Sequence, residues 1–83
     1  MRYPEDEFEE LLAKARLVEH LHMPCLLFSG HPIPISHRDP NTLDPARLGS
    51  EGKKYWVDGL TGPQRETLRQ KLVALRVEAR LKG

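Results

Sequence analysis

The sequence predicts a small α+β fold with two layers, in which an N-terminal and a C-terminal helix pack on one face of a two- or three-stranded, mainly antiparallel sheet. Apolar residues recur at helical spacing near both ends of the chain. Between them lie short apolar runs bounded by proline and glycine, which are typical of strands. The chain has 83 residues, of which 39% are hydrophobic and 30% charged, so we expect one globular domain over residues 1–83.

The first helix is expected from Pro4 to His22. Pro4 suits the first helical position, and the acidic residues that follow complement the positive end of the helix dipole. At about 100° per residue, one face of this helix carries Phe8, Leu11, Leu12, Ala15, Val18 and His22. Leu17 and Leu21 fall on roughly the opposite side, where a second layer or a second subunit would cover them. Pro24 ends the helix, because the residue before a proline avoids the α region.

Two strands are expected next. The apolar run Cys25–Gly30 has the length of a buried strand. If the following segment, HPIPISH at residues 31–37, is extended, then His31, Ile33, Ile35 and His37 share one face. Its prolines donate no ladder hydrogen bonds, so this segment can only be an edge strand or a polyproline-like segment. Such an edge blocks the addition of a further strand.

The remainder of the chain predicts a loop, a third strand and a helix. Residues 38–52 form the loop, in which Asp44 can cap a short turn. Lys53–Val57 has the aromatic and β-branched content of a strand. The last helix begins with a capping box, in which Thr61 is the N-cap and Gln64 stands three residues later. Its core stripe is formed by Leu68, Leu72, Leu75 and Ala79.

The four histidines and the single cysteine lie close together in the sequence, and they are of the types that bind zinc: His20, His22, Cys25, His31 and His37. Their spacing is poor for one metal. On a helix His20 and His22 point about 200° apart, and in an extended chain His31 and His37 lie roughly 20 Å apart. We therefore predict no metal ligands and no cofactor. Cys25 stands in an apolar run that would make its thiol inert, so we predict no catalytic residue either.

Arginines gather on one side of the last helix. Taking Arg65 as zero, Arg76, Arg69 and Arg80 fall at about 20°, 40° and 60°, beside the leucine stripe. We call these four residues the arginine ridge. Arginine binds carboxylates and phosphates bidentately, and nearby aromatic residues can anchor a partner. The predicted binding residues are therefore Arg65, Arg69, Arg76, Arg80, Tyr55 and Trp56, although core packing is an alternative role for Trp56.

The charge distribution leaves a second interpretation of the ridge open. Residues 5–22 hold six acidic and two basic residues, whereas residues 62–83 hold six basic and two acidic ones. If the two helices are neighbours, Glu9, Glu10 and Glu19 can pair with the ridge and occupy it. Apolar residues off the main stripe of the last helix, at positions 73, 77 and 81, point to a fully enclosed core or to an oligomer interface.

These features predict a small accessory or regulatory protein that acts by binding another macromolecule. We expect a protein partner or a second copy of the chain; a nucleic acid bound by the ridge is the alternative, and zinc binding is the third hypothesis. No apolar run approaches the 18–20 or so residues that span a bilayer, and the acidic start is unlike a signal peptide. With one cysteine, we expect a reducing cytoplasm. We expect neither a membrane partner, nor a small-molecule substrate, nor an enzyme.

Overall fold

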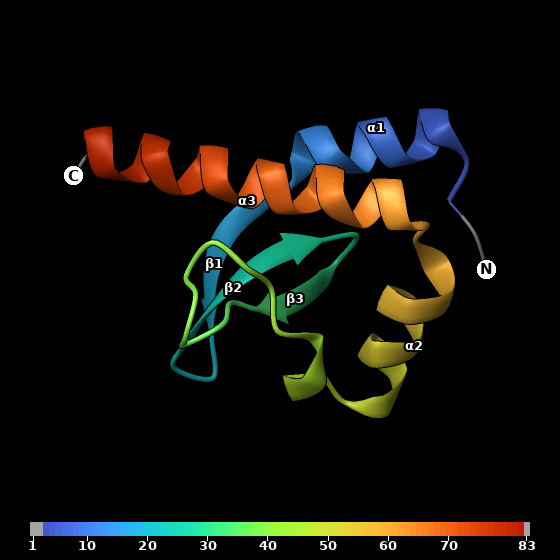
Figure 1. The fold of residues 1–83 in the computed structure, drawn as a ribbon, viewed down its shortest axis with the longest axis horizontal. Coiled ribbons are helices and arrows are strands. Elements are labelled where there is room, and N and C mark those ends of the chain that lie inside the picture. The colour runs from blue at the N-terminus through green and yellow to red at the C-terminus, as the bar shows by residue number, and fades with distance from the viewer. Residues whose placement is uncertain (1–2, 83) are drawn as a thin grey trace.

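The computed structural model describes residues 3–82, except for the side chains of residues 51, 55, 57 and 58. It confirms the α+β fold. Three antiparallel strands form a sheet in the order β1-β2-β3, and helices α1 and α3 lie side by side over one face of it (Figure 1). The elements are α1 (Glu5–Lys14), β1 (Arg16–His20), β2 (Met23–Phe28), β3 (His31–Pro34), the 3-10 turn η1 (Pro45–Arg47), α2 (Ser50–Gly59) and α3 (Gly62–Lys82).

The first helix is shorter than predicted, because the chain turns into a strand after Lys14. Ala15 has extended backbone angles, and residues 16–20 form β1. Val18 lies opposite Cys25 in the sheet, and His22 is in a turn, so neither extends the apolar face of the helix as expected. The predicted face holds for the first part only, which contributes Phe8, Leu11, Leu12 and Ala15 to the core.

Two tight turns connect the three strands. Ser29 and Gly30 join β2 to β3 with φ angles of 51° and 78°, and Leu21 and His22 join β1 to β2 with φ angles of 51° and 62°. Positive φ at both central residues is the pattern of a type I′ turn, whose twist matches that of the strands it connects. Gly30 made the turn between β2 and β3 recognisable in the sequence. The turn between β1 and β2 uses two residues that rarely adopt positive φ, and it was therefore missed.

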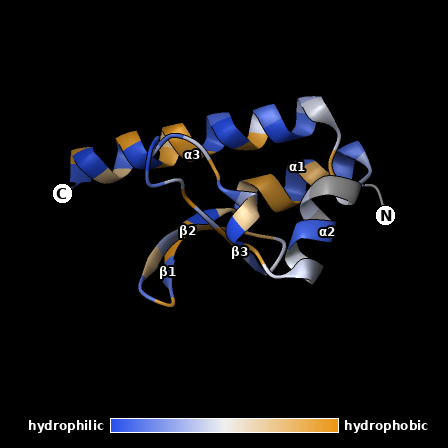
Figure 2. Ribbon diagram, turned by 60° about the horizontal axis from the view of Figure 1, so that its bottom comes forward, coloured by the Kyte–Doolittle hydropathy of each residue, from blue (hydrophilic) through white to orange (hydrophobic). Residues whose placement is uncertain are grey.

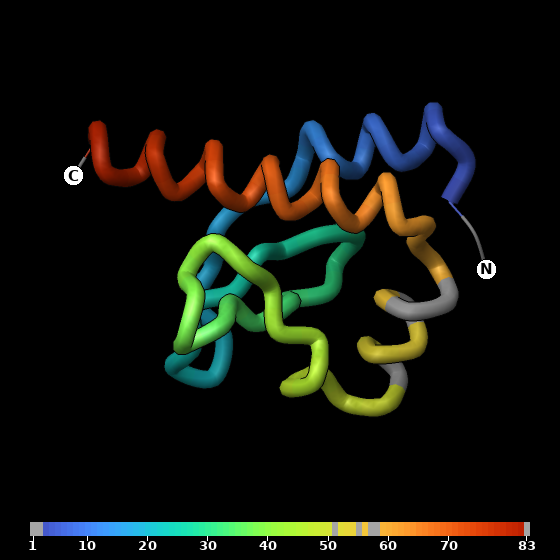
Figure 3. Tube along the Cα trace, in the orientation of Figure 1, coloured from blue at the N-terminus to red at the C-terminus, as the bar shows by residue number. Residues whose placement is uncertain are grey.

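Residues 53–57 were predicted as a strand, and this prediction is wrong. They lie in α2, which packs beside η1 at one end of the sheet (Figure 3). Gly52, Trp56 and Leu60, spaced four residues apart, line the same pocket beside the sheet, whereas Lys53 and Lys54 are exposed. In a strand, Lys54 would share the face of Gly52 and Trp56, whereas in a helix only residues three or four apart do, so its exposure fits the helix. In the loop before it, Asp44 precedes η1 as expected but forms no side-chain cap.

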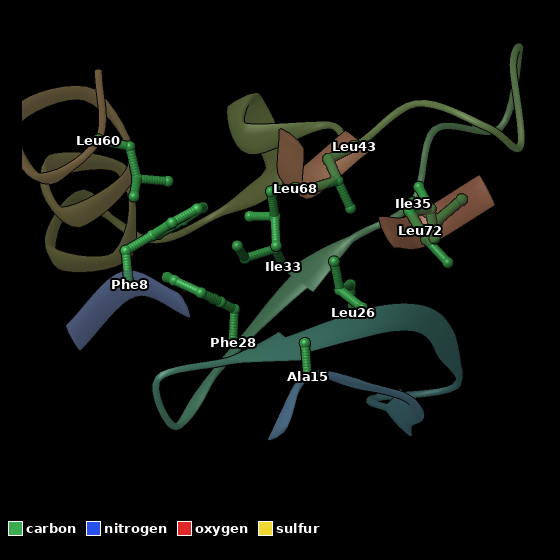
Figure 4. Close-up of a cluster of buried hydrophobic side chains, with 10 residues drawn as sticks. All are labelled: Phe8, Ala15, Leu26, Phe28, Ile33, Ile35, Leu43, Leu60, Leu68 and Leu72. Atoms are coloured by element: carbon green, nitrogen blue, oxygen red, sulfur yellow. The ribbon is translucent and has the colours of Figure 1, made fainter. Parts of the chain in front are cut away.

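The core lies between the sheet and the helices (Figure 4). Leu26 and Phe28 of β2 contribute to it together with Ile33 of β3 and Ile35, which directly follows β3. From the helices and loops come Phe8, Ala15, Leu43, Leu60, Leu68 and Leu72. Ile33 and Ile35 are 4% and 2% exposed, so both isoleucines of the proline-rich edge lie in the core.

Helix α3 begins as predicted and then outruns the sheet. The main-chain N–H of Thr61 donates to the side chain of Gln64 at 3.0 Å, and the N–H of Gln64 donates to the Thr61 hydroxyl at 3.3 Å, which confirms the capping box. Leu68 and Leu72 are fully buried, but Ala79 is exposed, contrary to the predicted core stripe. The last turns of α3 extend beyond the sheet (Figure 1), and apolar residues recur along them (Figure 2).

Candidate binding surface on the last helix

Three of the six predicted binding residues meet at one pocket on the surface. Trp56 comes from α2, and Arg65 and Arg69 come from the first turns of α3. The pocket has a volume of about 200 Å³ and is completed by Thr42, Leu43, Gly62 and Glu66. Sequence reasoning placed Thr42 in a loop but could not place that loop beside α3. The structure does so through Leu43, which is buried in the core.

Arg69 is already engaged by carboxylates on its own protein. Its guanidinium donates to Glu66 at 2.6, 3.0 and 3.2 Å, and this pairing holds the pKa of Glu66 below its usual value and raises the pKa of Arg69. Asp39 lies near enough for its charge to act on Arg69 as well. At this end of the ridge, a ligand would have to compete with internal carboxylates for Arg69.

Of the two aromatic residues predicted to bind a partner, the structure describes the side chain of Trp56 but not that of Tyr55. Trp56 is half-buried and packs against the hydrophobic core, so the role in packing that the sequence left open is confirmed. It also contributes to the lining of the pocket. The side chain of Tyr55 lies outside the described residues, so its predicted role stays a prediction.

The other half of the ridge lies further along α3. Arg76 is half-buried, and its Nε is shielded from solvent without a hydrogen-bond partner among the described residues, whereas Arg80 is exposed. The ion pairs between described side chains include neither arginine. Beside them Val77 and Leu81 are 49% and 85% exposed. We call Arg76, Val77, Arg80 and Leu81 the C-terminal patch.

Within the described part of the chain, the acidic first helix does not pair with the ridge. The ion pairs found there join residues three or four positions apart, namely Glu10 with Lys14, Glu19 with His22, Glu66 with Arg69, and Glu78 with Lys82. Arg65 and Arg69 line a pocket with residues of α2 and the loop before it, and α1 contributes nothing to that pocket. The acidic residues of α1 are exposed instead.

The histidines and the cysteine are dispersed. Cys25 is 1% exposed, and its burial raises the pKa of the thiol. The side chain of His22 is 99% exposed in the turn after β1, which overturns its predicted place on a core-facing helix. His31 lies opposite Phe28 at the start of β3, and His37 is exposed beyond that strand. Among the side chains that the structure describes, no three of histidine, cysteine, aspartate or glutamate come together as metal ligands.

A second pocket, of about 530 Å³, lies beside the turn between β2 and β3. It is lined by Leu11, Lys14, Arg16, Leu27, Ser29 and Gly30. Lys14 is paired with Glu10 at 3.4 Å, and the lining contains neither a carboxylate nor an imidazole that could activate the Ser29 hydroxyl. This pocket contains none of the predicted binding residues.

No protein-family model, curated protein or solved structure matches the chain. No described helix is both long and apolar enough to cross a membrane.

Proposed function

We propose that this protein acts by binding a partner protein through the arginine side of α3, and that the partner presents acidic side chains beside an apolar stripe. The observation that carries the proposal is the C-terminal patch. It combines two exposed apolar side chains with two arginines on a helical segment that extends beyond the sheet.

The spacing of the patch suits a helical or extended partner. Val77 and Leu81 are four residues apart, as are Arg76 and Arg80, so each pair forms neighbours about 5–6 Å apart on the helix surface. Exposed apolar residues grouped in this way are typical of interaction sites. Arginines at their side favour a carboxylate-bearing partner, because the guanidinium binds carboxylates through two parallel hydrogen bonds.

A nucleic-acid partner has less support. Trp56 packs against the core, which leaves it less free to stack on a base, and Arg69 is bound to Glu66. The exposed acids of α1 would repel a phosphate backbone. Nucleic-acid binding is therefore an outcome that the experiment must be able to detect.

The test uses two synthetic amphipathic helical peptides with the same leucine stripe, one flanked by glutamates and the other by lysines. Binding is measured by fluorescence anisotropy at about 50 mM and about 200 mM salt, together with mixed-sequence single- and double-stranded oligonucleotides. We expect the glutamate peptide to bind more tightly than the lysine peptide. The double variant Arg76→Glu/Arg80→Glu should weaken this binding about tenfold or more.

Arg16→Glu is the matched control, because Arg16 is exposed and lies in β1 rather than on α3. It should leave the peptide affinity within about twofold. Equal binding of both peptides, an unchanged affinity in the double variant, or tighter binding of an oligonucleotide than of the glutamate peptide would each overturn the proposal.

A further inference from the structure

The two edges of the sheet differ in their hydrogen-bonding capacity. In the order β1-β2-β3, strands β1 and β3 are the edges. An edge strand presents unpaired N–H and C=O groups, which can bind another strand. Whether each edge can do so depends on which residues direct their main-chain groups outward.

The edge at β3 is closed. The main-chain N–H of Ile35 donates to the Pro24 carbonyl at 3.0 Å, so Pro24 and Ile35 are a hydrogen-bonded pair in the register of β2 and β3. Since hydrogen-bonded and non-hydrogen-bonded pairs alternate, Pro32 and Pro34 are the β3 residues whose main chain faces outward. Neither has an N–H to donate, and the Pro34 carbonyl already accepts from the N–H of Asp44 at 2.7 Å.

The edge at β1 is open. Glu19 lies opposite Pro24, whose carbonyl is directed toward β3, so these two residues form a non-hydrogen-bonded pair. The N–H and C=O groups of Glu19, and of Leu17 two residues earlier, therefore point away from the sheet. Outside the sheet ladder, the main-chain hydrogen bonds of the described residues engage neither residue. Strand β1 contains no proline or glycine.

We propose that a second copy of this chain pairs antiparallel with β1 along this edge, which makes a symmetric dimer with a continuous sheet. One open and one closed edge favour a second copy. The open β1 edges of two copies can pair with each other, and the proline-rich β3 strands then form both outer edges of the joint sheet, where they block the addition of further strands. A register centred on Val18 places Val18 opposite its copy and Leu17 opposite Glu19 of the second copy. This register avoids placing Glu19 opposite itself.

The charge and the exposed surface of β1 agree with this pairing. The strand carries one positive side chain, Arg16, and one negative side chain, Glu19. With His20 counted as neutral, two copies of the strand therefore bring no net charge together. Leu21, which follows the strand directly and is 74% exposed, would come near Ala15 of the second copy. A five-residue strand pair buries less than the roughly 1,200 Å² of a standard interface, so we expect a Kd in the micromolar to millimolar range.

The first test measures the mass of the full chain by sedimentation equilibrium from about 20 µM to about 1 mM. We expect it to rise from 9.5 kDa toward twice that value. Glu19→Pro removes an outward N–H that β2 does not use, and should weaken the dimer about tenfold or more. Glu19→Ala removes the same side chain, keeps the N–H, and should change the Kd by less than about threefold.

A second measurement does not depend on the proline variant folding. Amide hydrogen exchange of the wild-type chain, read by NMR at both ends of that concentration range, should slow for Leu17 and Glu19 as the concentration rises. A monomer at about 1 mM would overturn the proposal. It would also be overturned by a dimer in which these two amides keep their exchange rates, or by one that Leu81→Glu disrupts and a folded Glu19→Pro does not.

Discussion

Gln64 holds the N-terminal segment against the start of α3. Its side-chain amide donates a hydrogen bond of 3.1 Å to the main-chain carbonyl of Tyr3, across 61 positions of sequence. The same side chain accepts the N–H of Thr61, and the residue is only 5% exposed. One residue thus caps the last helix and connects it to the beginning of the chain.

Replacing Gln64 by alanine should lower the free energy of unfolding by about 1–3 kcal/mol, because the Tyr3 carbonyl and the Thr61 N–H both lose a shielded partner. Urea unfolding followed by circular dichroism measures the loss. Gln70→Ala, on the exposed side of the same helix, should change stability by less than about 0.5 kcal/mol. Equal effects of the two variants would show that the connection to Tyr3 contributes nothing.

Two leucines of α3 should respond very differently to the same substitution. Leu68 is fully buried in the core, so Leu68→Ala should lower the free energy of unfolding by about 2–5 kcal/mol. Leu81 is 85% exposed, so Leu81→Ala should change the free energy of unfolding by less than about 0.5 kcal/mol. Thermal and urea unfolding at low protein concentration test this pair. A large loss for Leu81→Ala would mean that the last turn of α3 is covered in solution.

The two hairpin turns should respond in opposite directions to changes at their second residue. Gly30→Ala meets no neighbouring atom but forces alanine to φ 78°, and should destabilise by about 1–2 kcal/mol. His22→Gly removes the steric strain of a side chain at φ 62° and should raise the free energy of unfolding by up to about 1 kcal/mol. Midpoints of urea unfolding measure both. A loss of stability in His22→Gly would contradict the assigned turn geometry.

The loop beside α3 should be sensitive to acid. Hydrogen bonds from the Asn41 N–H and the Thr42 hydroxyl, and then the charge of Arg69, hold the pKa of Asp39 below its ordinary value of 3.8. A lowered folded pKa means that ionised Asp39 stabilises the protein above pH 3.8, and that this contribution is lost as the pH falls through the lowered value. Asp39→Asn should therefore destabilise near neutral pH and have no effect well below the lowered pKa.

Urea unfolding of wild type and Asp39→Asn between about pH 2 and pH 7 measures this dependence. Thr42→Val removes the hydroxyl donor, so an NMR titration of this variant should show the pKa of Asp39 moving up toward 3.8. A difference between wild type and Asp39→Asn that stays constant across the whole range would contradict the prediction.

The candidate site was partly predictable. The sequence identified the ridge, because arginines on one side of a helix follow from helical periodicity alone. It did not identify Thr42 or Asp39 near the ridge, because the path of a loop depends on which of its residues is buried, here Leu43. It also left open whether α1 occupies the ridge, since the side of α3 that faces α1 depends on how both helices rotate to bury their leucines.

The sequence by itself determined the features that depend on local chemistry. Thr61 and Gln64 specify the start of α3, and Pro32 and Pro34 specify an edge strand, because capping and the missing proline N–H act within a few residues. Only the tertiary structure decided that residues 16–20 form a strand and residues 53–57 a helix. Such short segments satisfy either periodicity, and the choice depends on the surface each one meets: β2 for the first, the core beside Trp56 for the second.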